Sequence, residues 1–243
     1  MSSGFGSVGK YGLVDFLHGR SDFEYVFASR EDAGRRLGQW LRHRRVEAEL
    51  VLGLPRGGVV VAAEVAHSLN VPLDVLIVRK IGHPLHREFA LGALAEGGVV
   101  VLDEMAMTSD PLVRAELDHV IAEESERLKN YQSRFPHALG ISSKVVLLVD
   151  DGLATGATTE AAVRSAWRLG ARGVIVSAPV GSTHAIERLQ RVADPVEVMW
   201  VDPEFDAVGR YYESFPQTTD EEVRDLLVST RGHSRTHQVN PLW

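Results

Sequence analysis

Two adjacent aspartates, Asp150 and Asp151, follow a short apolar run and precede a stretch of small and hydroxylated residues. The run, 145–149, shows no polar alternation, which is typical of a strand covered on both faces of a parallel sheet. In the stretch 152–159, backbone N–H groups can surround an anion, and the N-terminus of a following helix adds positive partial charge. These residues predict a cradle for a phosphorylated sugar.

The paired carboxylates suit a vicinal diol, because each hydroxyl can donate to a charged oxygen in a bond worth about 1.5–3 kcal/mol. Successive side chains of a straight strand point to opposite faces. Asp150 and Asp151 can therefore face one sugar only if the chain bends there, and we expect Gly152 to supply the backbone freedom.

This segment resembles the 5-phosphoribosyl-1-pyrophosphate (PRPP) signature of the type I phosphoribosyltransferases: an apolar strand, two acids, three variable positions, then Thr-Gly-x-Thr. The matching residues are Asp150, Asp151, Thr155, Gly156 and Thr158. The resemblance implies that the two aspartates are catalytic and hold the ribose 2- and 3-hydroxyls. It also implies a 5-phosphate loop made of Gly152, Leu153, Ala154, Thr155, Gly156, Ala157 and Thr158.

A second turn, Pro55-Arg56-Gly57-Gly58, follows the first expected core strand. Open α/β sheets bind ligands at this edge. Its place in the chain matches the family's pyrophosphate loop. The resemblance therefore implies that the Gly57 and Gly58 amides bind phosphate oxygens and that Arg56 acts in catalysis by binding the leaving group. A tight turn without a ligand is the alternative for this segment taken alone.

The step Arg79-Lys80-Ile81-Gly82 also lies at a strand end and resembles the Arg-Lys-x-Gly step of adenine-type members. The resemblance implies that Arg79 and Lys80 contact pyrophosphate, with Lys80 acting in catalysis. Two solvated cations are the alternative.

The loop that follows, 81–90, corresponds in order to the family's mobile lid, to which Arg87 and Glu88 would belong. Such lids exclude water while a reactive sugar cation forms. Further on, Phe205 and Tyr211 could stack on a flat acceptor base. Packing within a small cap is an equally weighted alternative for these two rings.

One position departs from part of the family. Hypoxanthine-guanine-type members carry a third acid three positions after the second aspartate, where this chain has Ala154. The departure argues against 6-oxopurine acceptors, while adenine-type members also have alanine there. Transfer to some other nitrogenous base therefore remains the expected activity.

The resemblance implies Mg²⁺, which would bridge pyrophosphate and ribose oxygens beside Asp150 and Asp151, directly or through water. Two carboxylates about 4 Å apart repel by roughly 4 kcal/mol at an effective dielectric near 20, so a cation would relieve their crowding. A PRPP-binding regulator and a hydrolase of phosphosugars or nucleotides are the alternatives to a transferase.

Composition narrows the class further. A net charge of −7 argues against nucleic-acid partners, and the absence of cysteine excludes disulfides and catalytic thiols. No apolar run approaches the roughly 20 residues of a membrane span and the N-terminus lacks a secretory pattern, so we expect a cytoplasmic protein without a membrane partner. Family analogy suggests a homodimer.

Strand-like and helix-like segments alternate, which predicts an α/β fold: a mostly parallel sheet flanked by helices, with a small cap built from the chain ends. We expect an N-terminal segment (1–28) that is partly flexible and can join the cap, a core (29–201), and a C-terminal cap segment and tail (202–243). Expected strands are 50–54, 73–78, 145–149, 173–178 and 196–201, with a hairpin around Gly97-Gly98. Expected helices are 30–43, 59–69, 109–132, 158–169 and 183–192.

Overall fold

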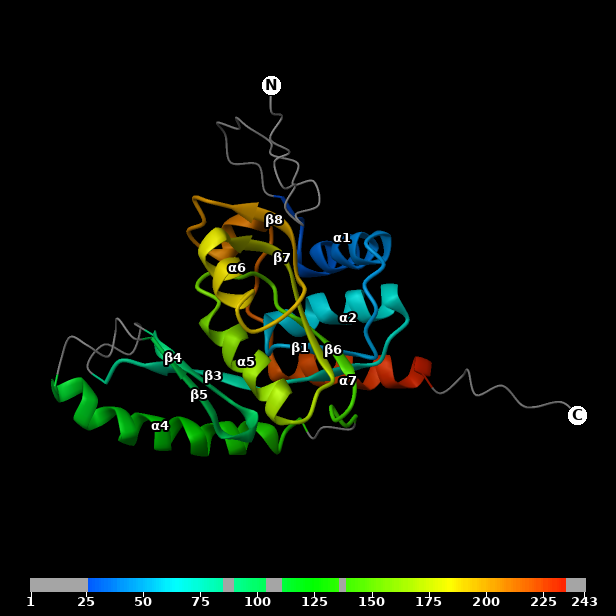
Figure 1. The fold of residues 1–243 in the computed structure, drawn as a ribbon. Coiled ribbons are helices and arrows are strands. Elements are labelled where there is room, and N and C mark those ends of the chain that lie inside the picture. The colour runs from blue at the N-terminus through cyan, green and yellow to red at the C-terminus, as the bar shows by residue number, and fades with distance from the viewer. Residues whose placement is uncertain (1–25, 85–89, 104–110, 136–138, 235–243) are drawn as a thin grey trace, which may run out of the picture.

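The computed structural model describes residues 26–84, 90–103, 111–135 and 139–234. Within them, a five-stranded parallel sheet has the order β2-β1-β6-β7-β8, and helices cover both of its faces (Figure 1). The expected fold class is confirmed. The strands are β1 (Leu50–Gly53), β2 (Leu73–Val75), β6 (Val145–Val149), β7 (Gly173–Ser182) and β8 (Val196–Asp202).

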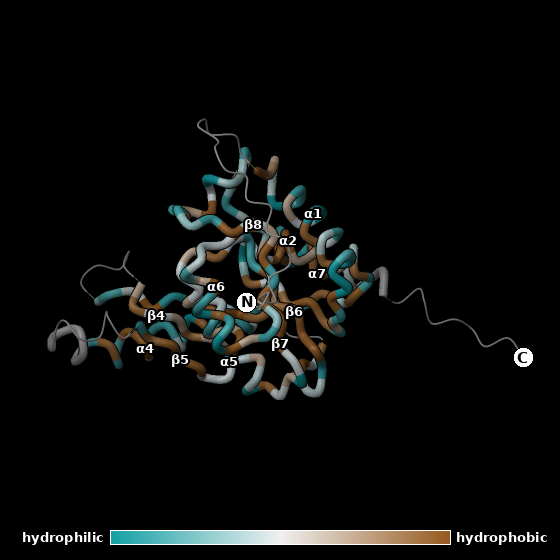
Figure 2. Tube along the Cα trace, turned by 45° about the horizontal axis from the view of Figure 1, so that its top comes forward, coloured by the Kyte–Doolittle hydropathy of each residue, from teal (hydrophilic) through white to brown (hydrophobic). Residues whose placement is uncertain are grey.

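Alternate residues of the central strands pack into two hydrophobic cores, one on each face of the sheet. Val51 and Leu147 pack on the side of α1 (Arg30–His43) and α2 (Gly57–Leu69). Leu52 and Leu148 pack on the side of α5 (Ala157–Arg168) and α6 (Thr183–Leu189). Because both faces are covered, the strands carry continuous apolar runs, visible as brown segments at β6 and β7 in Figure 2.

The expected strand 73–78 is wrong as a single element. The chain leaves the parallel sheet after Val75, and β3 (Val78–Gly82) opens a separate antiparallel sheet. The Ile77 N–H between the two strands donates to the Glu96 carboxylate at 2.9 Å, a contact that sequence spacing does not reveal. The mostly apolar segment 73–78 therefore contributes residues to two different sheets.

The second sheet continues with β4 (Ala90–Ala95), a 3₁₀ turn η1 (Glu96–Gly98) and β5 (Val99–Leu102). The hairpin expected at Gly97-Gly98 is confirmed, and both glycines have positive φ (74° and 70°), which favours glycine. The long helix α4 (Pro111–Gln132) contacts β3 and β4, while α5 contacts all three strands of this sheet (Figure 1).

The C-terminal region contains a helix that the sequence analysis did not predict, α7 (Asp220–Ser234), which packs on α2 through the buried Val223 and Leu227. A capping box begins it: the Thr219 N–H donates to the Glu222 carboxylate at 2.7 Å, and the Glu222 N–H donates to the Thr219 hydroxyl at 3.1 Å. The spacing Thr-x-x-Glu is the sequence pattern that could have predicted the start of this helix.

The N-terminal end of the described chain meets the segment that follows β8, near the top of Figure 1. Phe27 forms an isolated bridge with Tyr212, next to the 3₁₀ turn η2 (Val208–Tyr211), and the two rings lie 5.4 Å apart. Residues 1–25 and 235–243 lie outside the described part. In the portion that is described, no helix has the length and apolar character needed to span a membrane.

Candidate functional site

The strand order reverses between β1 and β6, which are neighbours in the sheet. At such a switch point the loops that follow the two strands diverge and leave a crevice where open α/β sheets bind ligands. Here those loops are 54–56 and 150–156, and the Leu54 N–H donates to the Val149 carbonyl at 3.0 Å. The fold therefore brings the predicted pyrophosphate turn beside the predicted sugar-phosphate cradle.

The turn touches both aspartates. A Cβ on Gly57 would lie 2.1 Å from Asp151 Oδ2, and one on Gly58 would lie 2.8 Å from Asp150 Oδ1. The Pro55–Arg56 peptide is cis. Helix α2 begins at Gly57, two residues before its expected start, so the Gly57 and Gly58 amides belong to the first helical turn and lack partners within the helix.

Both carboxylates face this turn, as the expected bend requires, but Gly152 has a different role from the one anticipated. Its φ is not in the left-handed region. A Cβ there would lie 2.6 Å from the Val208 side chain, so glycine makes room for the C-terminal segment against the site. The segment 202–212 is thereby packed onto the cradle.

The two carboxylates differ in their surroundings. Burial, together with the negative charge of Asp151, raises the pKa of Asp150 to about 8, against the opposing effects of its hydrogen bond from the Asp151 N–H and of Lys80 and Arg30. Asp151 instead accepts a 2.7 Å hydrogen bond from Arg30 Nε. Burial and the neighbouring charge of Asp151 thus raise the pKa of Asp150 and favour its protonated form, in line with the crowding expected of two close carboxylates.

Arg30 is the residue that sequence reasoning missed. Its side chain is buried, and besides Asp151 it donates from Nη1 to the Pro216 carbonyl at 2.6 Å, while its guanidinium carbon lies 3.6 Å from the centre of the Phe215 ring. Tyr212 also reaches the dyad, since its hydroxyl donates to the Asp151 carbonyl at 2.6 Å. Neither contact has a signal in local spacing, because the partners are 121 and 61 residues apart.

The loop after the aspartates ends at the N-terminus of α5, where Gly156 has a φ of 73° that favours glycine. The end of β7 holds this loop: Leu153 donates its N–H to the Val180 carbonyl at 2.9 Å, and the Ser182 hydroxyl donates to the Ala154 carbonyl at 2.6 Å. Leu153 is buried in the core, whereas Ala154 and Thr155 are exposed. Two helix N-termini, of α2 and α5, thus border the crevice.

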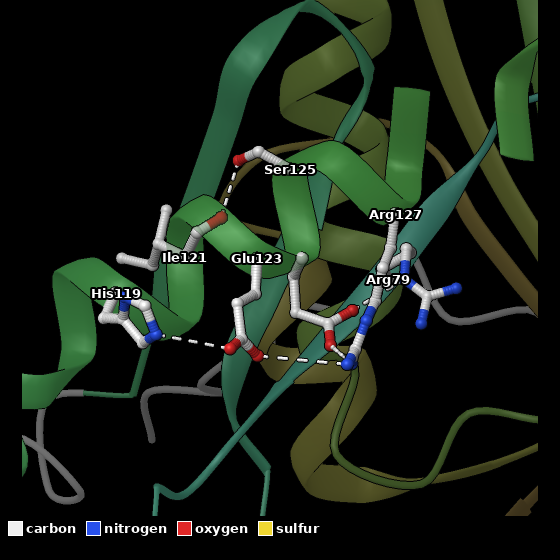
Figure 3. Close-up of polar contacts among 7 residues, drawn as sticks. Arg79, His119, Ile121, Glu123, Ser125 and Arg127 are labelled. Carbon is white, nitrogen blue, oxygen red and sulfur yellow. Dashed lines mark hydrogen bonds and ion pairs between the residues drawn. The ribbon is translucent and has the colours of Figure 1, made fainter. Parts of the chain in front are cut away.

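Lys80 and Arg79 lie on opposite faces of β3 because strand side chains alternate. Lys80 is exposed, and its positive charge opposes the rise in the pKa of Asp150. Arg79 points to α4, where its Nε donates to Glu124 at 2.7 Å (Figure 3). A pyrophosphate role for Arg79 stays a prediction and would require this ion pair to open.

The predicted stacking pair, Phe205 and Tyr211, stack on each other, with ring centres 5.1 Å apart and planes inclined by 21°. The Tyr211 hydroxyl donates to Asp202 at 2.6 Å, and the residue is buried. Both rings therefore take part in cap packing, and their contact with an acceptor stays a prediction. The lid residues Arg87 and Glu88 lie outside the described residues.

The dyad suits a magnesium ion that keeps several waters. Within residues 26–84, 90–103, 111–135 and 139–234, no group of three or more His, Asp or Glu side chains could hold a metal. Mg²⁺ is commonly bound by one or two carboxylates plus substrate phosphates, so a full protein cage is unnecessary. The oxygens of Asp150 and Asp151 match this donor set.

Comparisons with known proteins agree with this geometry. The family model described as "Phosphoribosyl transferase domain" matches residues 28–201. Over 209 residues the chain is 42% identical to "Putative phosphoribosyl transferase Rv0571c" of Mycobacterium tuberculosis, covering 83% of this chain and 46% of that protein. The chain thus spans about half the length of the curated relatives it matches.

A solved structure is also similar throughout most of the chain. The crystal structure of TT1426 from Thermus thermophilus is 43% identical, with a TM-score of 0.68, and the match covers 84% of this chain and 98% of that one. The two chains therefore share the same overall fold.

Proposed function

The chain belongs to the phosphoribosyl transferase domain family, and from this premise we propose that it transfers the 5-phosphoribosyl group of PRPP to a nitrogenous base and releases pyrophosphate. The observation that carries the proposal is the contact between the aspartate pair and the Pro-Arg-Gly-Gly turn at the switch point of the sheet. A sugar held by the aspartates would present its C1 substituent to the turn.

We assign different parts of the donor, PRPP, to different residues of the site. Asp150 and Asp151 accept hydrogen bonds from the ribose hydroxyls, and the loop from Gly152 to Thr158 holds the 5-phosphate at the N-terminus of α5. The amides of Gly57 and Gly58, at the start of α2, bind the pyrophosphate with Arg56 and Lys80. No side chain needs to form a covalent bond, because positioning and electrostatic stabilisation of the departing pyrophosphate suffice.

Magnesium supplies positive charge to the pyrophosphate and the ribose oxygens when bound beside the dyad. Asp150 and Asp151 would hold it directly or through water. The protein would thus contribute carboxylate oxygens to both the sugar and the metal.

The acceptor is proposed to be a base other than a 6-oxopurine, because Ala154 cannot act as a general base. The loop carbonyl of Ala154 is already bonded to Ser182, and its side chain is a methyl group. Acceptor recognition would fall to the segment 202–212, where Phe205 is partly exposed.

Pyrophosphate release from PRPP and Mg²⁺, measured with and without a panel of bases, tests the proposal. Release that depends on a base supports a transferase, whereas equal release without any base would indicate a hydrolase. Donor binding without release would indicate a PRPP-binding regulator.

The double variant Asp150→Asn, Asp151→Asn should lose turnover by at least about 100-fold, since charge-assisted hydrogen bonds to both hydroxyls are weakened. A matched control is Asp118→Asn, an exposed aspartate of α4 that lies outside the proposed site. Retained turnover in the double variant would contradict the assigned roles.

A further inference from the structure

A cavity of about 470 Å³ lies between the helices α1, α2 and α7, which pack side by side on one face of the parallel sheet (Figure 1). The segment 214–218, which precedes α7, also lines it. Four acidic residues contribute to its wall, namely Glu31, Glu64, Glu222 and Asp225. We call this cavity the acidic pocket. The described residues that line it include neither Asp150 nor Asp151, and none from the pyrophosphate turn or the loop 152–158.

The positive charge in the pocket does not balance these acids. Arg30 is the only arginine or lysine among its described lining residues. Its Nε donates to Asp151 at 2.7 Å, outside the pocket, and its Nη1 donates to the Pro216 carbonyl at 2.6 Å. Carboxylates gathered at one cavity repel one another unless cations oppose them. The arrangement therefore favours a cationic ligand.

None of the four carboxylates is paired with a cationic side chain in the described part of the chain. Glu64 and Asp225 form no side-chain hydrogen bond or ion pair with another described residue. Glu31 accepts a hydrogen bond only from a neighbouring serine hydroxyl. Glu222 accepts from the N–H and the hydroxyl of Thr219, and these hydrogen bonds hold its pKa below the usual value. The negative charge of the pocket thus remains available to a ligand.

Thr218 gives a second and independent sign of a ligand. This residue lines the pocket and is 7% exposed, and its hydroxyl has no hydrogen-bond partner among the described residues. In that part of the chain, only the Ser177 hydroxyl is both fully enclosed and unpartnered. The Thr218 oxygen is therefore open to the cavity that its residue lines. Buried hydroxyl groups are normally hydrogen-bonded, so this oxygen is suited to accept from a donor in the pocket.

The spacing of the acids indicates what kind of cation fits. Although four acids line one cavity, no three His, Asp or Glu side chains of the described residues lie close enough together to hold a metal ion. The charges are therefore spread along the wall. Val60 and Leu226 add apolar surface to the same wall, and a cavity of this size is typical of small-molecule sites. Methylene groups that link separate ammonium groups match both features.

From these observations we propose that the acidic pocket binds an aliphatic di- or polyamine in its ammonium form. The carboxylates of Glu64 and Asp225 would bind different ammonium groups, and the Thr218 hydroxyl would accept a hydrogen bond from one of them. The proposal goes beyond the transferase activity, because the pocket takes no residue from those assigned to PRPP, magnesium or the acceptor. Arg30 lines the pocket and donates to Asp151, and so connects it to the aspartate pair.

Calorimetric titration with spermidine in metal-free buffer tests the pocket directly. The wild-type chain should bind, and the variant Glu64→Gln, Asp225→Asn should bind at least about tenfold more weakly, because two charged acceptors are lost. The control Glu47→Gln, Asp118→Asn makes the same change in net charge at two exposed acids elsewhere, and it should leave the affinity within about twofold. Equal affinities in the two variants would overturn the site. Thermal denaturation verifies that each variant is folded.

Two finer comparisons test the assigned contacts. Thr218→Val replaces the free hydroxyl with a methyl group and should weaken spermidine binding by about threefold or more. Unchanged affinity would contradict the hydroxyl contact. Putrescine and n-butylamine share a four-carbon chain but carry two ammonium groups and one, so putrescine should bind at least about tenfold more tightly. Equal affinity of these two amines would contradict recognition by separate carboxylates.

Competition distinguishes a fitted amine from other cations. Spermidine should remain bound in the presence of an equal concentration of Mg²⁺, and complete displacement would overturn the proposal in favour of a general attraction to negative charge. Tighter binding of a tetralysine peptide than of spermidine would overturn the assignment to a small molecule. None of these measurements uses PRPP or a base, so failure of this proposal and failure of the transferase proposal remain distinguishable.

Discussion

The crevice side and the α4 side of β3 are built by different means. On the crevice side, consecutive residues at the ends of two parallel strands supply backbone amides and two short carboxylates, packed so closely that two glycines are required. On the α4 side, long arginine side chains from distant segments converge on an open cavity. The first arrangement should tolerate almost no change in shape, whereas the second should respond mainly to changes in charge.

Gly58→Ala should have the largest effect and tests the intolerance of the crevice side. The new Cβ would lie 2.9 Å from the Asp150 Cα and from the Val149 carbonyl oxygen, which are backbone atoms that cannot rotate away. We expect a loss of about 1–3 kcal/mol in the free energy of unfolding and at least about 100-fold in PRPP-dependent pyrophosphate release. Gly140→Ala is the control, because nothing lies within 4 Å of its added Cβ. Wild-type turnover in Gly58→Ala would show that the contact is not needed.

Arg30→Gln should have the next largest effect, because it leaves the Asp151 carboxylate without its partner and releases the 215–216 segment. Removing a charged partner from a mostly buried hydrogen bond costs about 1–3 kcal/mol, so donor affinity and stability should fall together. Arg30→Lys should retain part of the donor affinity and part of the stability. The control Arg35→Gln, which changes an exposed arginine, should lower neither. Urea unfolding and donor titration measure the two effects. A variant with unchanged donor affinity would limit Arg30 to a role in folding.

The pH dependence of stability separates Asp150 from an ordinary exposed acid. Its pKa is raised to about 8 in the folded chain, against about 3.9 when unfolded, so the folded state binds more protons between these values. The free energy of unfolding should therefore fall as pH rises from about 4 to 8. In Asp150→Asn this decline should shrink by about 1 kcal/mol or more, as measured by urea unfolding at pH 5 and pH 8. Identical pH profiles in both chains would contradict the raised pKa.

Glu124→Gln should have the smallest effect on stability and tests the charge sensitivity of the α4 side. Its partners Arg79 and Arg127 are about a third and a half exposed, so the ion pairs are worth about 1 kcal/mol or less. Urea unfolding of Glu124→Gln beside the wild-type chain measures this loss. A loss clearly above about 1 kcal/mol would show that the two ion pairs hold β3 and α4 together more strongly than exposed pairs do.

Local sequence predicted the crevice well and the α4 side poorly. The apolar run 145–149, the paired aspartates and the Thr-Gly-x-Thr spacing are local patterns, and the structure places them at the edge that parallel strands use for ligands. Arg127 lies in the expected helix 109–132 and Arg134 follows it, but nothing in their spacing shows which segment faces them. Likewise, the apolar run 73–78 could not reveal that its last residue enters a different sheet.

By itself, the sequence determined the kind of fold and which residue types follow the central strands, because strand periodicity, glycine positions and residue types act over a few neighbouring residues. Tertiary structure alone decided that Arg30 pairs with an aspartate 121 residues away, that Lys80 and Arg79 serve opposite faces, and that four arginines share one cavity. The physical reason is that charge and burial depend on distance in space. The tertiary fold, and not spacing along the sequence, sets those distances.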